Sequence, residues 1–168
     1  KTQNLRFGEA VKYLANIAGM QPYMFTKQDE EKEQKWKEYL SIYSRYVDFY
    51  HSKLLKNEKY FNAREYLKNR SLTKDEVKKF KIGFIEKNPS FFDKLKKEFS
   101  EKTLLESGLF YFDEKKNIFL ERFRGRLIFP INNISGQPIA LGGRIIESSD
   151  YLAKYINSPE TTFFKKGS

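Results

Sequence analysis

Three segments in the last third of the sequence decide how the chain folds: Arg122-Phe123-Arg124-Gly125-Arg126-Leu127-Ile128-Phe129-Pro130-Ile131, Ala140-Leu141-Gly142-Gly143-Arg144 and Lys154-Tyr155-Ile156-Asn157-Ser158-Pro159-Glu160-Thr161. Their apolar residues are arranged as in strands, and their cations lie at the ends of the apolar runs. Arg122, Arg124 and Arg126 are spaced by two, which in an extended segment puts three guanidinium groups on one face. Such a row favours an anion lying against it. The alternative is an edge strand whose charges prevent edge-to-edge pairing.

The residues around these segments predict strands after helices. A hairpin is expected from 109–112 and 118–120, and a second pair of strands from 126–132 and 138–146. Upstream, apolar residues recur at helical spacing in six segments, and each predicts a helix. The first ends at Gly19, the second is long and follows Thr26, and the third covers 59–69. The fourth follows Thr73, the fifth runs from Pro89 to Phe99, and the sixth ends before Gly108. In the long segment, Trp36, Leu40, Tyr43, Val47, Tyr50 and Leu54 form a packing seam. The predicted fold class is α+β, a helical amino-terminal half followed by a small, mainly antiparallel sheet.

The composition narrows the class of partner. The 168 residues include 32 basic and 22 acidic side chains, a net charge of +10, which favours a polyanion: nucleic acid or an anionic membrane surface. No apolar run approaches the ~20 residues that span a bilayer, and no basic amphipathic helix has a clean apolar face. Cysteine is absent and His51 is the single histidine, so no thiolate zinc site or disulfide framework is expected. A cytosolic protein fits these features.

Several kinds of catalytic site can be excluded from the motifs. The sequence has no Cys–His dyad, no Walker-type phosphate loop and no dinucleotide fingerprint. The acidic residues, among them Glu147, Asp150 and Glu160, are scattered and show none of the clustering that holds metals for phosphoryl transfer. Gly142-Gly143 within a strand pattern predicts a bulge or a close backbone approach. We therefore expect no catalytic residue within this chain.

The order and spacing of the motifs resemble bacterial DnaG-type primases, in the amino-terminal part of their RNA polymerase domain. The resemblance is strongest from residues 122 to 167, where Phe164-Lys165-Lys166-Gly167 completes the pattern, and weaker over 63–84. Residues 4–15 resemble the end of the family's zinc-binding domain, although Arg6 stands where a Ser or Thr commonly caps the helix. Ser71 replaces a usual glycine, which implies a strained backbone if φ is positive there.

The resemblance also implies a division of the chain. Residues 1–25 would be the end of the zinc-binding domain with a linker helix, 26–58 a long linker helix, and 59–168 the amino-terminal subdomain of the RNA polymerase domain. This family makes short RNA primers on single-stranded DNA at the replication fork. The alternative is a non-catalytic module that binds single-stranded nucleic acid or docks a partner protein.

Basic residues at matching motif positions are the candidate site. The resemblance implies that they contact the template strand, the primer or the incoming nucleotide: Arg70, Arg122, Arg124, Lys154 and Lys166, with Arg144 and Asn157 in second rank. Arginine grips phosphate with a fork of donors and lysine acts as a point charge. We expect the first five to converge on one surface.

The remaining expectations concern groups outside this chain. In the family the metal-binding acids lie in a later Toprim segment, so magnesium or manganese, and zinc upstream, are implied only for the full-length enzyme, and the fragment alone is expected to be inactive. The implied partners are single-stranded DNA template, RNA primer and nucleoside triphosphates, with the replicative helicase and single-strand-binding protein for the full-length protein, and no membrane. A bacterial, cytoplasmic and nucleoid-associated location follows from the same resemblance.

Overall fold

The computed structural model describes residues 7–20, 26–147 and 150–166, and it divides into two compact units, Lys1–Trp36 and Lys37–Ser168. In the first unit, α1 (Phe7–Ile17) is followed by Gly19, whose φ of 62° suits a helix end. Arg6 lies outside the described residues. Thr26 caps the start of α2 (Lys27–Lys56), since the Asp29 backbone N–H donates to the Thr26 hydroxyl at 3.3 Å. No described helix is both long and apolar enough to cross a membrane.

Within the second unit, α2 is the frame on which the other elements pack. Its buried face carries four tyrosines among aliphatic residues: Tyr39, Ile42, Tyr43, Tyr46, Val47, Tyr50 and Leu54. The Tyr46 ring lies edge-on to the rings of Tyr50 and Phe110, with centroids 5.0 and 5.7 Å apart. Buried rings remove a large area from water, so this aromatic stripe gives a highly charged chain its core.

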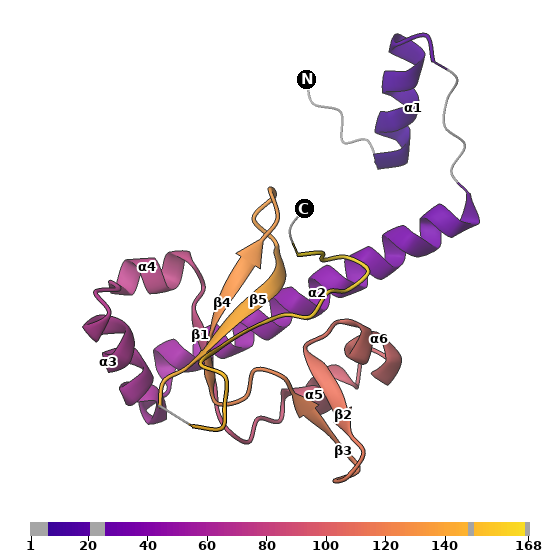
Figure 1. The fold of residues 1–168 in the computed structure, drawn as a ribbon. Coiled ribbons are helices and arrows are strands. Elements are labelled where there is room, and N and C mark those ends of the chain that lie inside the picture. Colours follow the sequence, from indigo (N-terminus) through magenta and orange to yellow (C-terminus); the bar gives the residue numbers. More distant parts are fainter. Residues whose placement is uncertain (1–6, 21–25, 148–149, 167–168) are drawn as a thin grey trace. The chain divides into compact units, whose positions relative to one another are not determined.

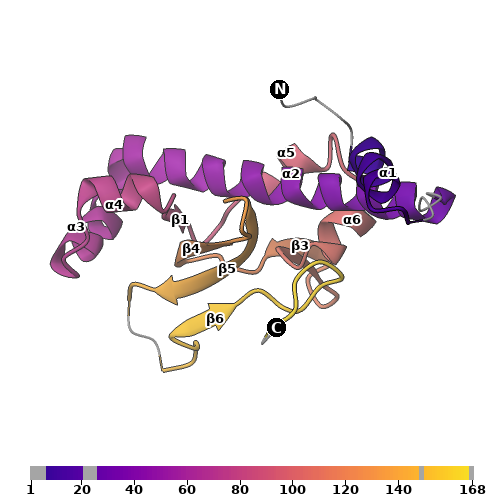
Figure 2. The ribbon, with the colours of Figure 1, turned by 90° about the horizontal axis from the view of Figure 1, so that it is seen from above.

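A four-stranded antiparallel sheet lies against α2, with strand order β1-β4-β5-β6 (Figures 1 and 2). The strands are β1 (Gly83–Ile85), β4 (Arg126–Asn132), β5 (Pro138–Ile145) and β6 (Tyr155–Asn157). Gly83 brings β1 close to the helix, because a Cβ there would lie 3.0 Å from the His51 backbone nitrogen. Pro130 needs no ladder partner on one side, since β1 pairs with β4 only as far as Ile128. The predicted α+β class is confirmed.

The hairpin of the second sheet packs with two short helices. It pairs β2 (Phe110–Asp113) with β3 (Ile118–Glu121), as the alternating pattern predicted. The helices are α5 (Phe91–Leu95) and α6 (Glu101–Glu106), and α5 ends before Phe99, which the sequence pattern had included. Stacking of the Phe92 and Phe119 rings, 4.4 Å apart, fixes α5 on the hairpin. Phe91 and Phe92 of α5 are therefore part of the core.

The C-terminal end of α2 carries a helical corner, which Figure 1 shows at the left. It consists of the 3-10 helix η1 (Glu58–Tyr60), α3 (Phe61–Asn69) and α4 (Lys74–Lys79). Ser71, which joins the helices, has a φ of 61°, so the residue that replaces the family's glycine does adopt the left-handed conformation. Thr73 and Glu76 form a capping box, and it fixes the start of α4.

The arginine row is not extended, which corrects one expectation. Residues 122–125 form a turn between β3 and β4, and only Arg126 belongs to a strand. Gly125, with a φ of 72°, allows the chain to reverse, and its N–H donates to the Glu86 carbonyl at 3.1 Å. Spacing by two therefore does not place three guanidinium groups on one strand face, and the protected edge strand is excluded as well.

Candidate nucleic-acid interface

Two tyrosine rings flank the guanidinium of Arg144. The Arg144 Cζ lies 5.4 Å from the centroid of Tyr66 and 4.9 Å from that of Tyr155. Arg70 shares the Tyr66 ring, with its Cζ 5.5 Å from the centroid, because residues four apart on α3 lie on one face. Cation–π contacts of this kind hold a guanidinium in place without neutralising it. The aromatic rings thus fix two positive charges that remain open to an anion.

Arg70, Arg144 and Lys154 line one hollow of about 260 Å³, although they come from α3, β5 and the segment before β6. Glu147 also lines it, but its carboxylate pairs with Lys87 at 3.0 Å. The Arg144 Nε is buried and has no hydrogen-bond partner among the described residues. The three cations that line the hollow suit an oxygen-rich anion such as phosphate.

A second pair of cations gathers on the ring of Tyr111. The Cζ atoms of Arg122 and Arg124 lie 5.7 and 5.5 Å from its centroid. Arg122 donates from Nε to the Gly108 carbonyl at 2.8 Å, and Arg124 donates to the Tyr111 hydroxyl. The structure therefore brings these two arginines together through an aromatic ring of the hairpin, and not through a strand face.

Arg126 connects the two groups. Only 6% of its surface is exposed, and its guanidinium donates to the Lys154 carbonyl at 3.4 Å. Burial, and then the charge of Arg124, lower the pKa of Arg126 below its ordinary value, although an arginine remains protonated. Arg126 thus positions the backbone of Lys154 beside the arginine turn.

Asn157 is the last residue of β6, and Lys166 lies on the segment that follows this strand. Both are exposed, and the described contacts bring neither into the hollow of Arg70. The Lys166 backbone N–H donates to the Glu160 carboxylate at 3.1 Å. The segment is anchored by Ser158, whose buried hydroxyl accepts from the Leu141 backbone N–H at 2.9 Å. The five first-rank cations fall into three groups: Arg70 with Lys154, Arg122 with Arg124, and Lys166 by itself. That they act as one surface therefore stays a prediction.

Sequence reasoning missed the aromatic partners and one buried acid. Tyr66, Tyr111 and Tyr155 were not among the predicted site residues. The spacing of Tyr66 and Arg70 by four was an available signal for one of these contacts. The others depend on tertiary pairing between the hairpin and the arginine turn, or between β5 and β6, which no local pattern encodes.

Glu121 is the missed acid, and it holds the base of the arginine turn. Only 2% of its surface is exposed; its carboxylate accepts from the Tyr50 hydroxyl at 2.7 Å and from the Phe91 backbone N–H at 2.9 Å. Burial raises the pKa of Glu121 above its ordinary value, because desolvation penalises the charged form more than these hydrogen bonds favour it. The carboxylate therefore ties α2 and α5 to the residue that precedes Arg122.

This raised pKa predicts a pH-dependent stability. A carboxyl that binds its proton more tightly in the folded chain contributes most below its unfolded pKa, and this contribution is lost as the pH rises through the folded pKa. The wild type should lose this contribution as the pH rises, whereas Glu121→Gln does not titrate at this position. The difference between the melting temperature of Glu121→Gln and that of the wild type should therefore increase from about pH 4 to about pH 7. Thermal melts across this range measure it.

Glu98→Gln is the control for that series. Glu98 is exposed, and the hydrogen bond from Arg45 lowers its pKa, so the small change it produces with pH should have the opposite sign. A melting-temperature difference for Glu121→Gln that stays constant with pH would show that Glu121 does not titrate in this range.

The described residues do not fit a catalytic metal. They contain no group of three His, Cys, Asp or Glu side chains close enough to hold an ion. The arginines that lie on Tyr66 and on Tyr111 would repel a metal cation.

Comparisons with known proteins show the family of the chain. A family profile, DNA primase catalytic core, N-terminal domain, matches residues 49–168. The DNA primase of Lactococcus lactis is 37% identical over 162 residues, which cover 95% of this chain and 25% of that protein. The RNA polymerase domain of Mycobacterium tuberculosis primase DnaG, solved with double-stranded DNA, superposes with a TM-score of 0.71 at 30% identity over 79% of this chain and 42% of that one.

A third solved structure, a DnaG primase catalytic domain bound to single-stranded DNA, has a TM-score of 0.68 at 28% identity and covers 80% of this chain and 43% of that one. The chain belongs to the family of DNA primase catalytic cores, in their N-terminal domain. It spans roughly a quarter of the length of the curated relatives it matches.

Proposed function

We propose that this chain is the template-handling part of a DNA primase, which makes short RNA primers on single-stranded DNA. Its basic residues would hold phosphates of the template, primer or incoming nucleotide beside a metal site formed by other residues of the longer protein. The observation that carries the proposal is the hollow in which Arg70, Arg144 and Lys154 meet between two tyrosine rings. Cations interleaved with exposed rings are what single-stranded nucleic acid binds.

The family membership supports the same assignment. Two related catalytic domains were solved with DNA, one with a duplex and one with a single strand. The proposed roles of Arg122, Arg124, Lys166 and Asn157 rest on their motif positions and on their charge or polarity. Magnesium or manganese chemistry, zinc binding, and contacts with the helicase and single-strand-binding protein belong to the proposal for the longer protein, as does its cytoplasmic, nucleoid-associated location.

Binding of single-stranded DNA should be weak and strongly salt-dependent. Each phosphate contact releases counterions, so a site that neutralises several phosphates loses affinity linearly in the logarithm of salt, by about 0.7 per contact. We expect this slope for oligothymidylate measured by fluorescence anisotropy between low and physiological salt. Arg70→Ala should reduce the slope, whereas the exposed Lys97→Ala, which lies outside the hollow, should not.

An affinity that does not change with salt would contradict the proposal and indicate an apolar partner. A primer-synthesis assay of the isolated chain with template, nucleoside triphosphates and magnesium separates the binding role from catalysis. We expect binding without RNA product. RNA made by a contaminant-free preparation would place the metal site within these residues.

A further inference from the structure

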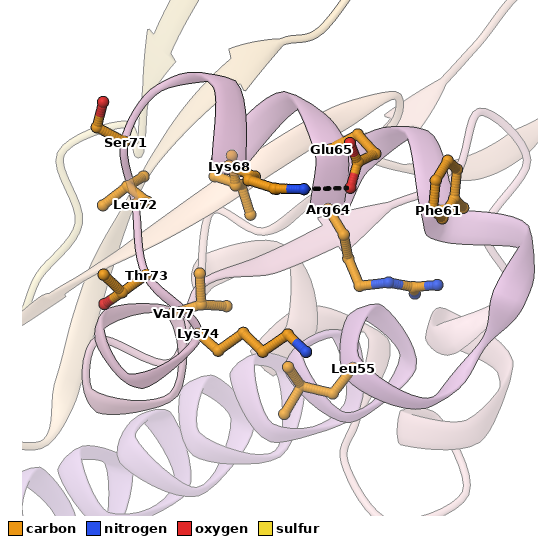
Figure 3. Close-up of a pocket in the computed structure, with 11 residues that line it drawn as sticks. Leu55, Phe61, Arg64, Glu65, Lys68, Ser71, Leu72, Thr73, Lys74 and Val77 are labelled. Atoms are coloured by element: carbon orange, nitrogen blue, oxygen red, sulfur yellow. Dashed lines mark ion pairs between the residues drawn. The ribbon is translucent and has the colours of Figure 1, made fainter.

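A second hollow lies at the helical corner, away from the cations described above. It has a volume of about 540 Å³, within the ~300–1,000 Å³ range of ligand sites. Apolar side chains from α2, α3, α4 and the turn between α3 and α4 form its walls: Leu55, Phe61, Leu67, Leu72 and Val77. Figure 3 shows Leu55, Phe61 and Arg64 facing one another across it. It shares no lining residue with the hollow of Arg70, so an inference drawn here does not depend on the proposed function.

The walls of this hollow are fixed by the turn between the helices. Ser71 has the positive φ that reverses the chain after α3, and the Leu72 N–H donates to the Leu67 carbonyl at 3.1 Å. The capping box of Thr73 and Glu76 then fixes the first turn of α4. An apolar surface held open by a fixed turn, with Phe61 57% exposed, is the form of a preformed docking site.

Arg64 supplies a fixed cation inside the apolar walls. Its Nη1 donates to the carbonyls of Leu54 and Asn57 at 2.8 and 2.7 Å, which hold the guanidinium against the end of α2. Its Nε and Nη2 donors have no partner among the described residues. A guanidinium anchored on one side and open on the other presents the fork that a carboxylate fits.

The rim adds to this positive charge. Lys74 lines the hollow and has no ion-pair partner among the described residues, and its ammonium points toward Leu55 in Figure 3. The acid of the lining, Glu65, lies 3.9 Å from Lys68, which offsets its charge. Two uncompensated cations therefore border an apolar surface, and the complementary ligand carries carboxylates beside apolar side chains.

We propose that this hollow binds a peptide segment of a partner protein, in which a large apolar residue is adjacent to Asp or Glu. The apolar walls distinguish it from a phosphate track, where cations interleave with exposed rings. A membrane surface is a poorer fit, because a concave hollow cannot lie flat on lipid headgroups. The apolar side chain enters the hollow and the carboxylate meets Arg64 and Lys74.

A differential peptide selection tests the proposal. Random nine-residue peptides displayed on phage are selected on the wild-type chain and counter-selected on the double variant Phe61→Ser/Lys74→Glu. Neither change should weaken the fold, since Phe61 is exposed and a glutamate at the first position of α4 favours the helix dipole. The matched control is Phe80→Ser/Lys97→Glu, because Phe80 is 53% exposed and both residues lie outside the hollow.

We expect the enriched peptides to carry Leu, Ile, Phe or Met next to Asp or Glu. Synthetic copies should bind the wild type and the control equally, and the double variant about tenfold or more weakly. Enriched peptides without acids, or an equal loss in the control, would overturn the proposal. So would no enrichment, or displacement of the peptide by oligothymidylate or by phosphatidylglycerol vesicles at equal charge, which would assign the hollow to nucleic acid or to a membrane.

Discussion

Replacing Lys154 by alanine in the complete polymerase is expected to reduce primer synthesis by about ten- to a hundredfold. Lys154 lines the hollow that it shares with Arg70 and Arg144, and its side chain is exposed. A hydrogen bond from a charged group to phosphate contributes about 1.5–3 kcal/mol, and each 1.4 kcal/mol is about tenfold. The loss should appear as weaker use of template or nucleotide, measured as primer yield at limiting concentrations of each.

The fold should tolerate this change. The backbone carbonyl of Lys154 accepts hydrogen bonds from the Ile145 N–H at 3.1 Å and from Arg126 at 3.4 Å, and alanine retains both. The melting temperature should therefore match that of the wild type. Lys97→Ala removes an equal charge from an exposed position outside the hollow and serves as the control.

Two outcomes would contradict the role of Lys154. Equal losses in Lys154→Ala and Lys97→Ala would mean that only the net charge matters. A lowered melting temperature in Lys154→Ala would mean that the residue stabilises the fold. In the proposed role, the salt slope of single-stranded DNA binding also falls by about 0.7 for Lys154→Ala and not for Lys97→Ala.

Local patterns predicted most of the elements correctly. The hairpin of β2 and β3 follows from alternating residues on either side of a polar turn, and the start of α4 follows from Thr73 and Glu76. The glycine that the family has at position 71 raised the question of a left-handed backbone there, and Ser71 has a φ of 61°. These features depend on residues within a few positions of one another, so they can be predicted from the sequence alone.

The arginine row shows where a local pattern is not sufficient. Residues spaced by two occur in strands and in many turns alike. Here Gly125, with a φ of 72°, allows the turn. Glu121 could not be predicted either, because its partners Tyr50 and Phe91 lie 71 and 30 residues away along the chain. A buried acid is recognised only once the groups that surround it are known.

For the glycine pair of β5, one part of the prediction was right and the other depended on a distant residue. The sequence predicted a bulge or a close backbone approach, but the strand register is continuous at Gly142 and Gly143. The close approach is made by a side chain, the ring of Phe123. A Cβ on Gly143 would lie 2.5 Å from the Phe123 Cδ1 atom and 3.2 Å from the Arg126 Cδ atom. Phe123 is fully buried, so the ring cannot withdraw into solvent without moving core neighbours.

Gly143→Ala should therefore destabilise the protein by about 1–3 kcal/mol, the usual cost of overpacking a core. For a chain of this size that lowers the melting temperature by about 3–10 °C. Gly142→Ala is the matched control, because its Cβ would lie 3.5 Å from the nearest atom, the Asn157 Oδ1, which is an ordinary contact. Thermal melts of both variants measure the difference, and equal melting temperatures would show that the Phe123 ring can move.

The same substitution should also weaken DNA binding. Phe123 lies between Arg122 and Arg124 in the turn, so a displaced ring shifts the two guanidinium groups that meet on Tyr111. Binding of oligothymidylate, measured well below the melting temperature, should fall for Gly143→Ala and stay unchanged for Gly142→Ala. If Gly143→Ala is destabilised but binds DNA as the wild type does, the packing of Phe123 does not determine the positions of Arg122 and Arg124. The turn would then keep its shape when the ring is displaced.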